Sequence, residues 1–230
     1  SCSVHDNVVA AGGVGGAFVF YAKDYSNKIL TPPVAVEPLK TPSSSAQSRR
    51  LTDKYGIQIS HRCIVHNVSI IRNTVLDSSY DSSGGGISVF GYSKALISIE
   101  DSFFGDNTAK EGGGVSVFNG GRLYLYQCNF LNHRAYLSGG IALVDGLGSH
   151  LHVSKSTFRN SSALQRGGAV AVRDSGIVHM NGTEIRHSFS RVGGAFYIDE
   201  KASVHMLNSR VRVASCISHV DKCKGGGAYL

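Results

Sequence analysis

A repeated Gly-Gly pair limits the possible folds of this 230-residue chain more than any other feature. In the central repeats, an apolar stretch follows each pair, and a Ser, Thr or Cys follows later, two residues before a large apolar residue. An array with a fixed period of this size indicates a solenoid, in which each unit packs only on its neighbours. The pairs from the middle of the chain onward start at Gly85, Gly113, Gly139, Gly167, Gly193 and Gly226.

Within each repeat, apolar and polar residues alternate with a period of two, as in Ile97-Ser-Ile99 and Leu123-Tyr-Leu125. This alternation is typical of strands, and no long stretch shows the helical period. We therefore predict an all-β fold, a parallel β-helix of about seven coils spaced about 4.8 Å apart. Two inward columns are expected: Ile99, Leu125, Val153, Met180 and Met206 on one face, and Phe104, Phe130, Phe158, Ile185 and Val211 on another.

The domain organisation is predicted to be one β-helix over residues 1–230 with two insertions. The long insertion, residues 21–62, contains Pro and Ser stretches, and proline prevents regular strand pairing. The smaller insertion, residues 213–225, lies where the interval between Gly-Gly pairs lengthens. Loops as long as the first are uncommon unless they are functional or disordered.

The repeat Gly-Gly-(Ala/Ile/Val) alternating with Ser-x-Phe-x-x-Asn resembles the repeats of chlamydial polymorphic outer membrane proteins. Its full form occurs at Phe104-Gly-Asp-Asn107, and His133, Ser161 and Ser188 replace the Asn elsewhere. The resemblance covers most of residues 63–230 and the first twenty residues. It implies a right-handed parallel β-helix used in adhesion, surface display or fibrous assembly, and it brings no catalytic residues.

Charge and hydropathy exclude several classes of function. The formal net charge is +7, but no Lys/Arg block stands out, so we expect anionic partners to be possible and nucleic acid not to be one. No run approaches the roughly 18 apolar residues of a membrane helix, so we predict no transmembrane segment. We expect no cofactor.

Enzymatic activity is not expected, although pectate lyases and polygalacturonases also use parallel β-helices. Such sites need clustered acids for Ca²⁺ or paired carboxylates for acid–base chemistry. Here the acids are scattered, and only Asp145, Asp174 and Asp199, which follow Gly-Gly strands, could stack near one another. A polysaccharide lyase or hydrolase is therefore the third alternative for the function.

Two polar columns are candidate binding sites. His152, His179 and His205 recur at one outward position, where they could share a transition metal or form a plain ladder of like residues. The plain ladder is the favoured interpretation. Arg159, Arg186 and Arg212 also align and could bind the sulfate or carboxylate groups of a glycan. The favoured alternative there is a solvated edge neutralised by acids.

The five cysteines suggest an oxidising compartment. If Cys2 and Cys63 occupy equivalent positions in adjacent coils, their Cα atoms lie within disulfide range. Cys216 and Cys223 flank a short segment and are predicted to form the second disulfide. Cys128 has serines at the same position in both neighbouring repeats, so we predict a free, buried thiol.

Three sequons agree with secretion, at Asn67, Asn160 and Asn181. We expect all three to be exposed, with Asn67-Val-Ser aligned with Asn181-Gly-Thr at the same turn. If the source is eukaryotic, at least two should carry N-glycans.

These observations predict a secreted or cell-surface structural repeat protein without enzymatic activity, the subunit of an extracellular filament. Its partners would be copies of itself, joined head to tail, or an adjoining β-helix, because the chain opens and closes in mid-repeat; truncation of a longer β-helix is the alternative. The strands after the Gly-Gly pairs are apolar on both faces, which predicts a stripe needing cover. One face is expected to carry Ile87, Val115, Leu143 and Ala171, and the other Ser88, Ser116, Ala142 and Val170. The proposed cover is an arm formed by Ile29, Leu30, Pro32, Pro33, Val34 and Val36, which reaches a neighbour's stripe or, as the alternative, lies on its own. The alternative function is a carbohydrate-binding adhesin.

Overall fold

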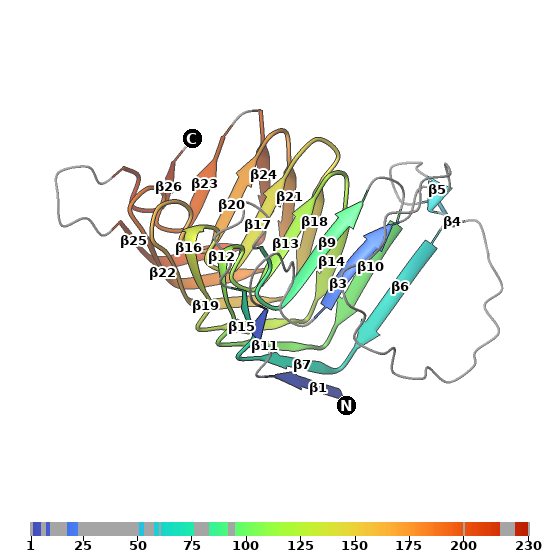
Figure 1. Cartoon of the computed structure of the whole chain (residues 1–230). Coiled ribbons are helices and arrows are strands. Elements are labelled where there is room, and N and C mark those ends of the chain that lie inside the picture. The colour runs from blue at the N-terminus through green and yellow to red at the C-terminus, as the bar shows by residue number, and fades with distance from the viewer. Residues whose placement is uncertain are drawn as a thin grey trace.

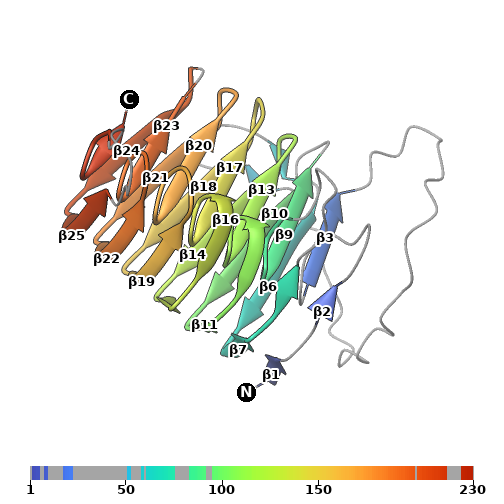
Figure 2. The same ribbon diagram turned by 60° about the vertical axis from the view of Figure 1, so that its left-hand side comes forward.

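The computed structural model describes residues 2–5, 8–9, 18–22, 51–52, 58–59, 61–75, 83–91, 95–199, 201–216 and 224–229. Within these ranges all regular secondary structure is β-strand, and the strands stack into a solenoid with β1 at one end and β26 at the other (Figures 1 and 2). No helix in the described ranges is long and apolar enough to cross a membrane. The predicted all-β parallel β-helix is confirmed.

Three parallel sheets, here called faces A, B and C, form the sides of the solenoid. Face A contains β1 (Cys2–His5), β2 (Val8–Val9), β7 (Val68–Ile71), β8 (Thr74–Val75), β11 (Phe103–Gly105), β12 (Thr108–Glu111), β15 (Asn129–Leu131), β16 (Arg134–Ser138), β19 (Thr157–Ala163), β22 (Glu184–Ser190) and β25 (Arg210–Cys216). Face B contains β3 (Phe18–Ala22), β9 (Ile87–Gly91), β13 (Val115–Phe118), β17 (Ala142–Asp145), β20 (Val170–Arg173), β23 (Phe196–Ile198) and β26 (Ala228–Tyr229). Face C contains β6 (His61–His66), β10 (Ala95–Glu100), β14 (Arg122–Tyr126), β18 (His150–Ser154), β21 (Ile177–Asn181) and β24 (Ser203–Leu207).

Each coil passes through face A, then face B, then face C. The chain makes about five full turns, fewer than the seven predicted. The difference arises at the two ends, where the long insertion separates β3 from β6 and where β25 and β26 form only part of a further coil.

Both predicted inward columns have the expected register. Strand pairing aligns Ile99 with Leu125, and Phe104 with Phe130, and continues through the later members of each column. The rings of Phe104 and Phe130 stack with centroids 4.3 Å apart, and Phe158 meets Phe130 edge-on at 4.9 Å. All three side chains are almost fully buried, so this aromatic column is a main part of the apolar core.

Residues with a left-handed backbone conformation turn the chain at the end of each face C strand. This conformation is costly for most L-residues but is tolerated by Asn, Asp and Gly. The residues at this position are Asn67, Asp101, Gln127, Lys155, Gly182 and Asn208. In the first five of these six residues, the backbone N–H donates to a carbonyl of the following coil.

A column of buried polar side chains follows the aromatic column at the bend within face A. Asn107 Oδ1 accepts from the backbone and the side chain of Asn73, at 2.9 and 3.0 Å, and its Nδ2 donates to the carbonyl of Ile70. Ile70-Ile-Arg-Asn73 is therefore a second copy of the motif Phe104-Gly-Asp-Asn107, with Ile70 in the place of Phe104. This second copy was not predicted from the sequence. In the next coils His133, Ser161 and Ser188 take the same inward position.

On face B, the strand register differs by one residue from the predicted register. The difference begins after the second repeat, where Val115 was expected beside Ile141. Val115 pairs with Ala142 and Ser116 with Leu143, because the first two Gly-Gly pairs belong to Gly triplets and the next pair, at Gly139, does not. Ala142 and Val144 consequently point into the main core, whereas Leu143 and Ala171 point outward with Ser88 and Ser116.

The outward side of face B is covered by the chain itself. The segment before each glycine turn lies over it, so that Ser88 Oγ donates to the carbonyl of Ser83, and Val192 packs on a cluster with Leu143, Ala171 and Tyr197. Leu143 and Ala171 are fully buried. The predicted apolar stripe in need of a neighbour's arm was therefore wrong, and the arm residues Ile29 to Val36 lie outside the described residues.

The observed strand ends shift the boundaries of both insertions. β3 continues to Ala22 and β6 begins at His61, so the first insertion occupies residues 23–60. It includes a short antiparallel pair, β4 (Leu51–Thr52) with β5 (Gln58–Ile59). β25 runs to Cys216, so residues 213–216 belong to the solenoid and the second insertion starts later than predicted.

The predicted Cys2–Cys63 disulfide was wrong. Cys63 is a free thiol, and β6 pairs it with Ile97 on face C, whereas Cys2 pairs with Val68 on face A. The two residues are therefore not equivalent in the repeat. Cys128 is free and buried as predicted, and burial raises its pKa to about 11. Cys216 is disulfide-bonded. Its proposed partner Cys223 lies outside the described residues, so that pairing stays a prediction.

Candidate functional site

The three predicted arginines form a ladder on the outside of face A. Strand pairing places Arg159 beside Arg186 and Arg186 beside Arg212. All three side chains are at least partly exposed. Neighbouring strands lie about 4.8 Å apart, so the ladder presents a row of guanidinium groups along the solenoid axis.

One carboxylate stands within this basic surface. Glu184 Oε2 is 2.8 Å from Nη2 of Arg186, and its Oε1 is 3.3 Å from Nε of Arg212. The hydrogen bond from Arg186 lowers the pKa of Glu184, and the charges of Arg186, Arg212 and Arg210 lower it further. Three arginines thus act on a single acid. The sequence analysis missed Glu184 and Arg210, although Glu184 precedes Arg186 by two residues and so shares its strand face.

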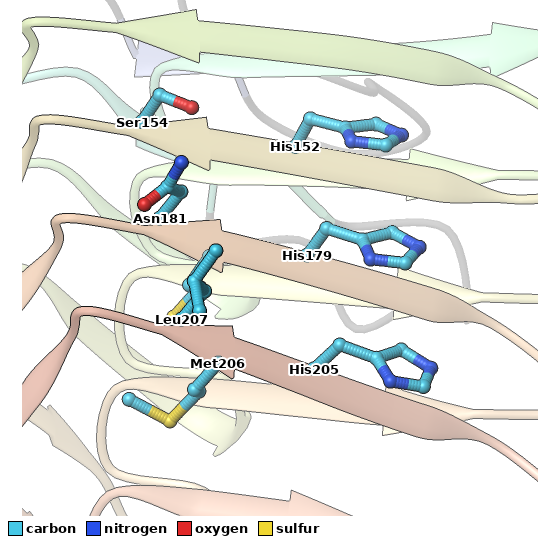
Figure 3. Close-up of a pocket in the computed structure, with 8 residues that line it drawn as sticks. His152, Ser154, His179, Asn181, His205, Met206 and Leu207 are labelled. Atoms are coloured by element: carbon cyan, nitrogen blue, oxygen red, sulfur yellow. The ribbon is translucent and has the colours of Figure 1, made fainter. Parts of the chain in front are cut away.

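The predicted histidines also form a ladder, on the outside of face C. The rings of His152, His179 and His205 stack with centroids 4.8 Å apart and planes within 13° of parallel, and Tyr124 stacks on His152 at 4.3 Å. Figure 3 shows the three rings on successive strands beside a second row formed by Ser154, Asn181 and Leu207. The two rows line a shallow groove of about 230 Å³.

The stacked geometry does not suit a shared metal ion. A metal bound to imidazole lies close to the ring plane, about 2.1 Å from the nitrogen. Nearly parallel rings 4.8 Å apart cannot both meet that condition for one ion. Across the described ranges, no group of three or more His, Cys, Asp or Glu residues could hold a metal. The observed geometry therefore favours the plain ladder of like residues for this column.

The acids after the face B strands do not stack as expected. Asp145 pairs with Arg173, not with Asp174. Nη1 of Arg173 lies 2.9 Å from Glu111, and its Nη2 lies 2.6 Å from Asp145. Burial alone would lower the pKa of Arg173, but the charges of Glu111 and Asp145 raise it above its ordinary value. Asp199, one coil later, accepts a hydrogen bond from the hydroxyl of Tyr197 at 2.6 Å.

The three sequon asparagines are all exposed. Their expected alignment was wrong by one residue, because Gly182 and not Asn181 occupies the left-handed position of Asn67. Asn181 is the last residue of β21 and belongs to the second row of the face C groove. Asn160 has a left-handed backbone at the bend of face A, and its Nδ2 donates to Asn132 Oδ1 at 3.2 Å.

The parallel coils, continuous apolar core and outward side-chain ladders define a β-solenoid. The family model for a right-handed β-helix region matches residues 44–212, so the chain belongs to this family. This membership fits a structural or surface repeat protein. Neither the comparison with curated proteins nor the comparison with solved structures yields a match. The finer resemblance to polymorphic outer membrane protein repeats stays a prediction.

Proposed function

We propose that this chain is a non-enzymatic, secreted or cell-surface repeat protein whose β-helix binds acidic glycans along face A. The observation that carries the proposal is the in-register column of Arg159, Arg186 and Arg212 with a single carboxylate beside it. Guanidinium groups pair with carboxylate and sulfate in a two-pronged geometry. Successive coils repeat the guanidinium group along the solenoid axis. An acidic glycan likewise carries its charged groups at repeated positions along its chain.

The strands make this surface rigid before any ligand binds. β19, β22 and β25 each contribute seven residues to the same sheet and hold the arginine backbones in register. A preorganised row loses little conformational entropy on binding. Several weak contacts to one polymer then add up by raising the effective concentration of each following contact.

A non-enzymatic role is supported by the ion pairs that Glu111 and Asp145 form with Arg173. Glycoside hydrolysis by paired carboxylates needs one group to donate a proton and the other to act as base or nucleophile. Here Glu111 and Asp145 both pair with Arg173, and the side chain of Arg173 is only 22% exposed. These two carboxylates accordingly help to stabilise the coil packing.

Substitutions in the arginine ladder test the proposal. Arg159→Ala should weaken binding of a sulfated or uronate-containing glycan by about tenfold, equal to about 1.4 kcal/mol. Glu184→Gln should strengthen binding by about threefold to fivefold, because it releases Arg186 and Arg212 from their ion pairs with this carboxylate. Titration calorimetry at two salt concentrations measures both effects.

The matched control is Arg122→Ala, which removes one positive charge from face C. It should leave the affinity within about twofold, since exposed charges beyond a Debye length of about 10 Å are largely screened. Equal losses for Arg122→Ala and Arg159→Ala would indicate non-specific attraction and contradict the ladder. Glycan cleavage during the titration would contradict the non-enzymatic assignment.

Filament assembly is the second candidate function. The coil formed by β24 and β25 exposes residues of the inward columns, with Met206 39% and Val211 38% exposed, whereas Met180 and Ile185 in the preceding coil are buried. A further coil stacked there, from a second copy or from a continuation of the same chain, would bury them. Exposed strand edges also favour pairing with another chain.

Deleting residues 28–50 tests whether the long insertion couples such copies. If the insertion is the coupling arm, the variant should remain a folded monomer at concentrations where the intact chain forms filaments. Electron microscopy and sedimentation velocity measure the difference. Filaments that persist after the deletion would contradict the coupling role.

A further inference from the structure

We propose that the groove on face C is the seat of the first sugar residues of an N-glycan attached to Asn181. The inference rests on the secretory part of the proposed function and is independent of the arginine ladder. It begins from the position of Asn181, whose exposed side chain is itself part of the groove.

The outward residues that line the groove are Asn181 and its nearest neighbours on the sheet. Ser154 and Leu207 pair with Asn181 on the two adjacent strands, which lie about 4.8 Å away. His179 stands two residues before Asn181 on the same strand. His152 and His205 pair with His179 on the two adjacent strands and so lie diagonally from Asn181 (Figure 3). A sugar linked to Nδ2 of Asn181 therefore starts inside the groove.

The chemistry of the lining suits an uncharged amino sugar. None of the lining residues is Asp, Glu, Lys or Arg. The hydroxyl of Ser154 and the imidazole edges of the histidines can exchange hydrogen bonds with sugar hydroxyls. Leu207, which is 62% exposed, offers apolar surface to the face of a sugar ring or to an acetamido methyl group.

The volume of the groove also suits a short sugar segment. At about 230 Å³ it is smaller than the clefts of about 300–1,000 Å³ that enclose drug-sized ligands. One or two sugar rings would fill it, and the rest of a glycan would extend into solvent. The seated sugars would also cover part of the apolar surface of Leu207.

The other two sequons lack this arrangement. Asn67 and Asn160 both adopt the left-handed conformation at bends of the coil, with φ of 54° and 51°. Beside Asn67, Nε2 of His66 lies 2.9 Å from Oδ2 of Asp101. Glycans at these bends would project away from the sheet faces. The structure thus predicts one seated glycan and two free ones on the same chain.

Site-resolved deglycosylation tests the inference. The full chain, secreted from a eukaryotic host, is treated natively with peptide-N-glycosidase, and release at each asparagine is followed by mass spectrometry. Release at Asn181 should be at least about tenfold slower than at Asn160, which corresponds to protection of about 1.4 kcal/mol. After denaturation the two rates should become equal.

Variants separate seating from local folding effects. Leu207→Ala with His205→Ala removes one wall of the groove and should bring the rate at Asn181 close to that at Asn160. Leu164→Ala changes an exposed leucine that is not part of the groove, and should leave the ratio unchanged. Equal native rates at Asn181 and Asn160, or no glycan at Asn181 while Asn67 and Asn160 are modified, would overturn the inference. A chain without any glycan would overturn both the inference and the predicted glycoprotein.

Discussion

Replacing Gly168 by alanine is expected to destabilise the protein by about 4 kcal/mol or more, or to prevent folding. Gly168 is the second glycine of its turn, and a Cβ there would overlap the carbonyl oxygen of Gly194 in the next coil. It would also lie 2.5 Å from the backbone nitrogen of Phe189 and 2.6 Å from its oxygen. These are backbone atoms held in strand pairing, so they cannot rotate away as a flexible side chain could.

Gly226→Ala is the matched control, because Gly226 occupies the same position in the last described coil. The nearest heavy atom to a Cβ there is the oxygen of Ala214, at 4.0 Å. We expect Gly226→Ala to change stability by less than about 1 kcal/mol, measured by urea unfolding with circular dichroism. If both variants lose the same stability, the cost comes from the turn conformation and not from the contact between coils.

Acidification is expected to remove about 3 kcal/mol of stability through His133 alone. His133 is 1% exposed, and burial lowers its pKa from 6.5 to about 4. The unfolded chain therefore binds a proton near pH 6.5 that the folded protein accepts only near pH 4. The stabilising contribution is fully present above about pH 6.5. It is lost as the pH falls from about 6.5 to about 4, at about 1.4 kcal/mol for each pH unit.

His133→Asn should abolish this component, since asparagine does not titrate and already occupies the same inward position at Asn107. Urea unfolding of both proteins between about pH 7 and pH 4 gives the difference curve, which should change by about 3 kcal/mol. His187→Asn, the same substitution at an exposed bend, is the control and should leave the curve parallel to the wild type. A constant difference between wild type and His133→Asn across this range would contradict the buried neutral imidazole.

The inward columns were predictable from the sequence because their spacing is short and repeated. Ile99 and Phe104 recur in later coils with the same alternation, and a parallel strand stack must place equivalent positions side by side. The same reasoning placed Arg159 beside Arg186, and His152 beside His179. It left two alternatives for each ladder, glycan binding or a neutralised edge for the arginines and a shared metal or a plain ladder for the histidines, since the residue type at an outward position does not identify a ligand.

Errors arose where the repeat changes length. The extra glycine at Gly112-Gly113-Gly114 shifts the count by one, and a one-residue slip moves every side chain of a strand to the opposite face. Leu143 and Ala171 were therefore assigned to the wrong side of face B. A slip of one residue also led to the mistaken equivalence of Asn67 with Asn181. Cys2 and Cys63 were mistaken for equivalent residues for another reason, since Cys2 lies on face A and Cys63 on face C.

The amino-acid sequence by itself determined the solenoid and its apolar columns, because local alternation and a regular glycine spacing repeat the same physical requirement in every coil. Tertiary structure alone decided which side chains meet on the outer faces. Coil stacking brings Arg173 to Glu111, 62 residues away, and surrounds Asn181 with side chains from three strands. Such contacts depend on the number of residues in each turn and on which segment covers which face, and no local pattern encodes either.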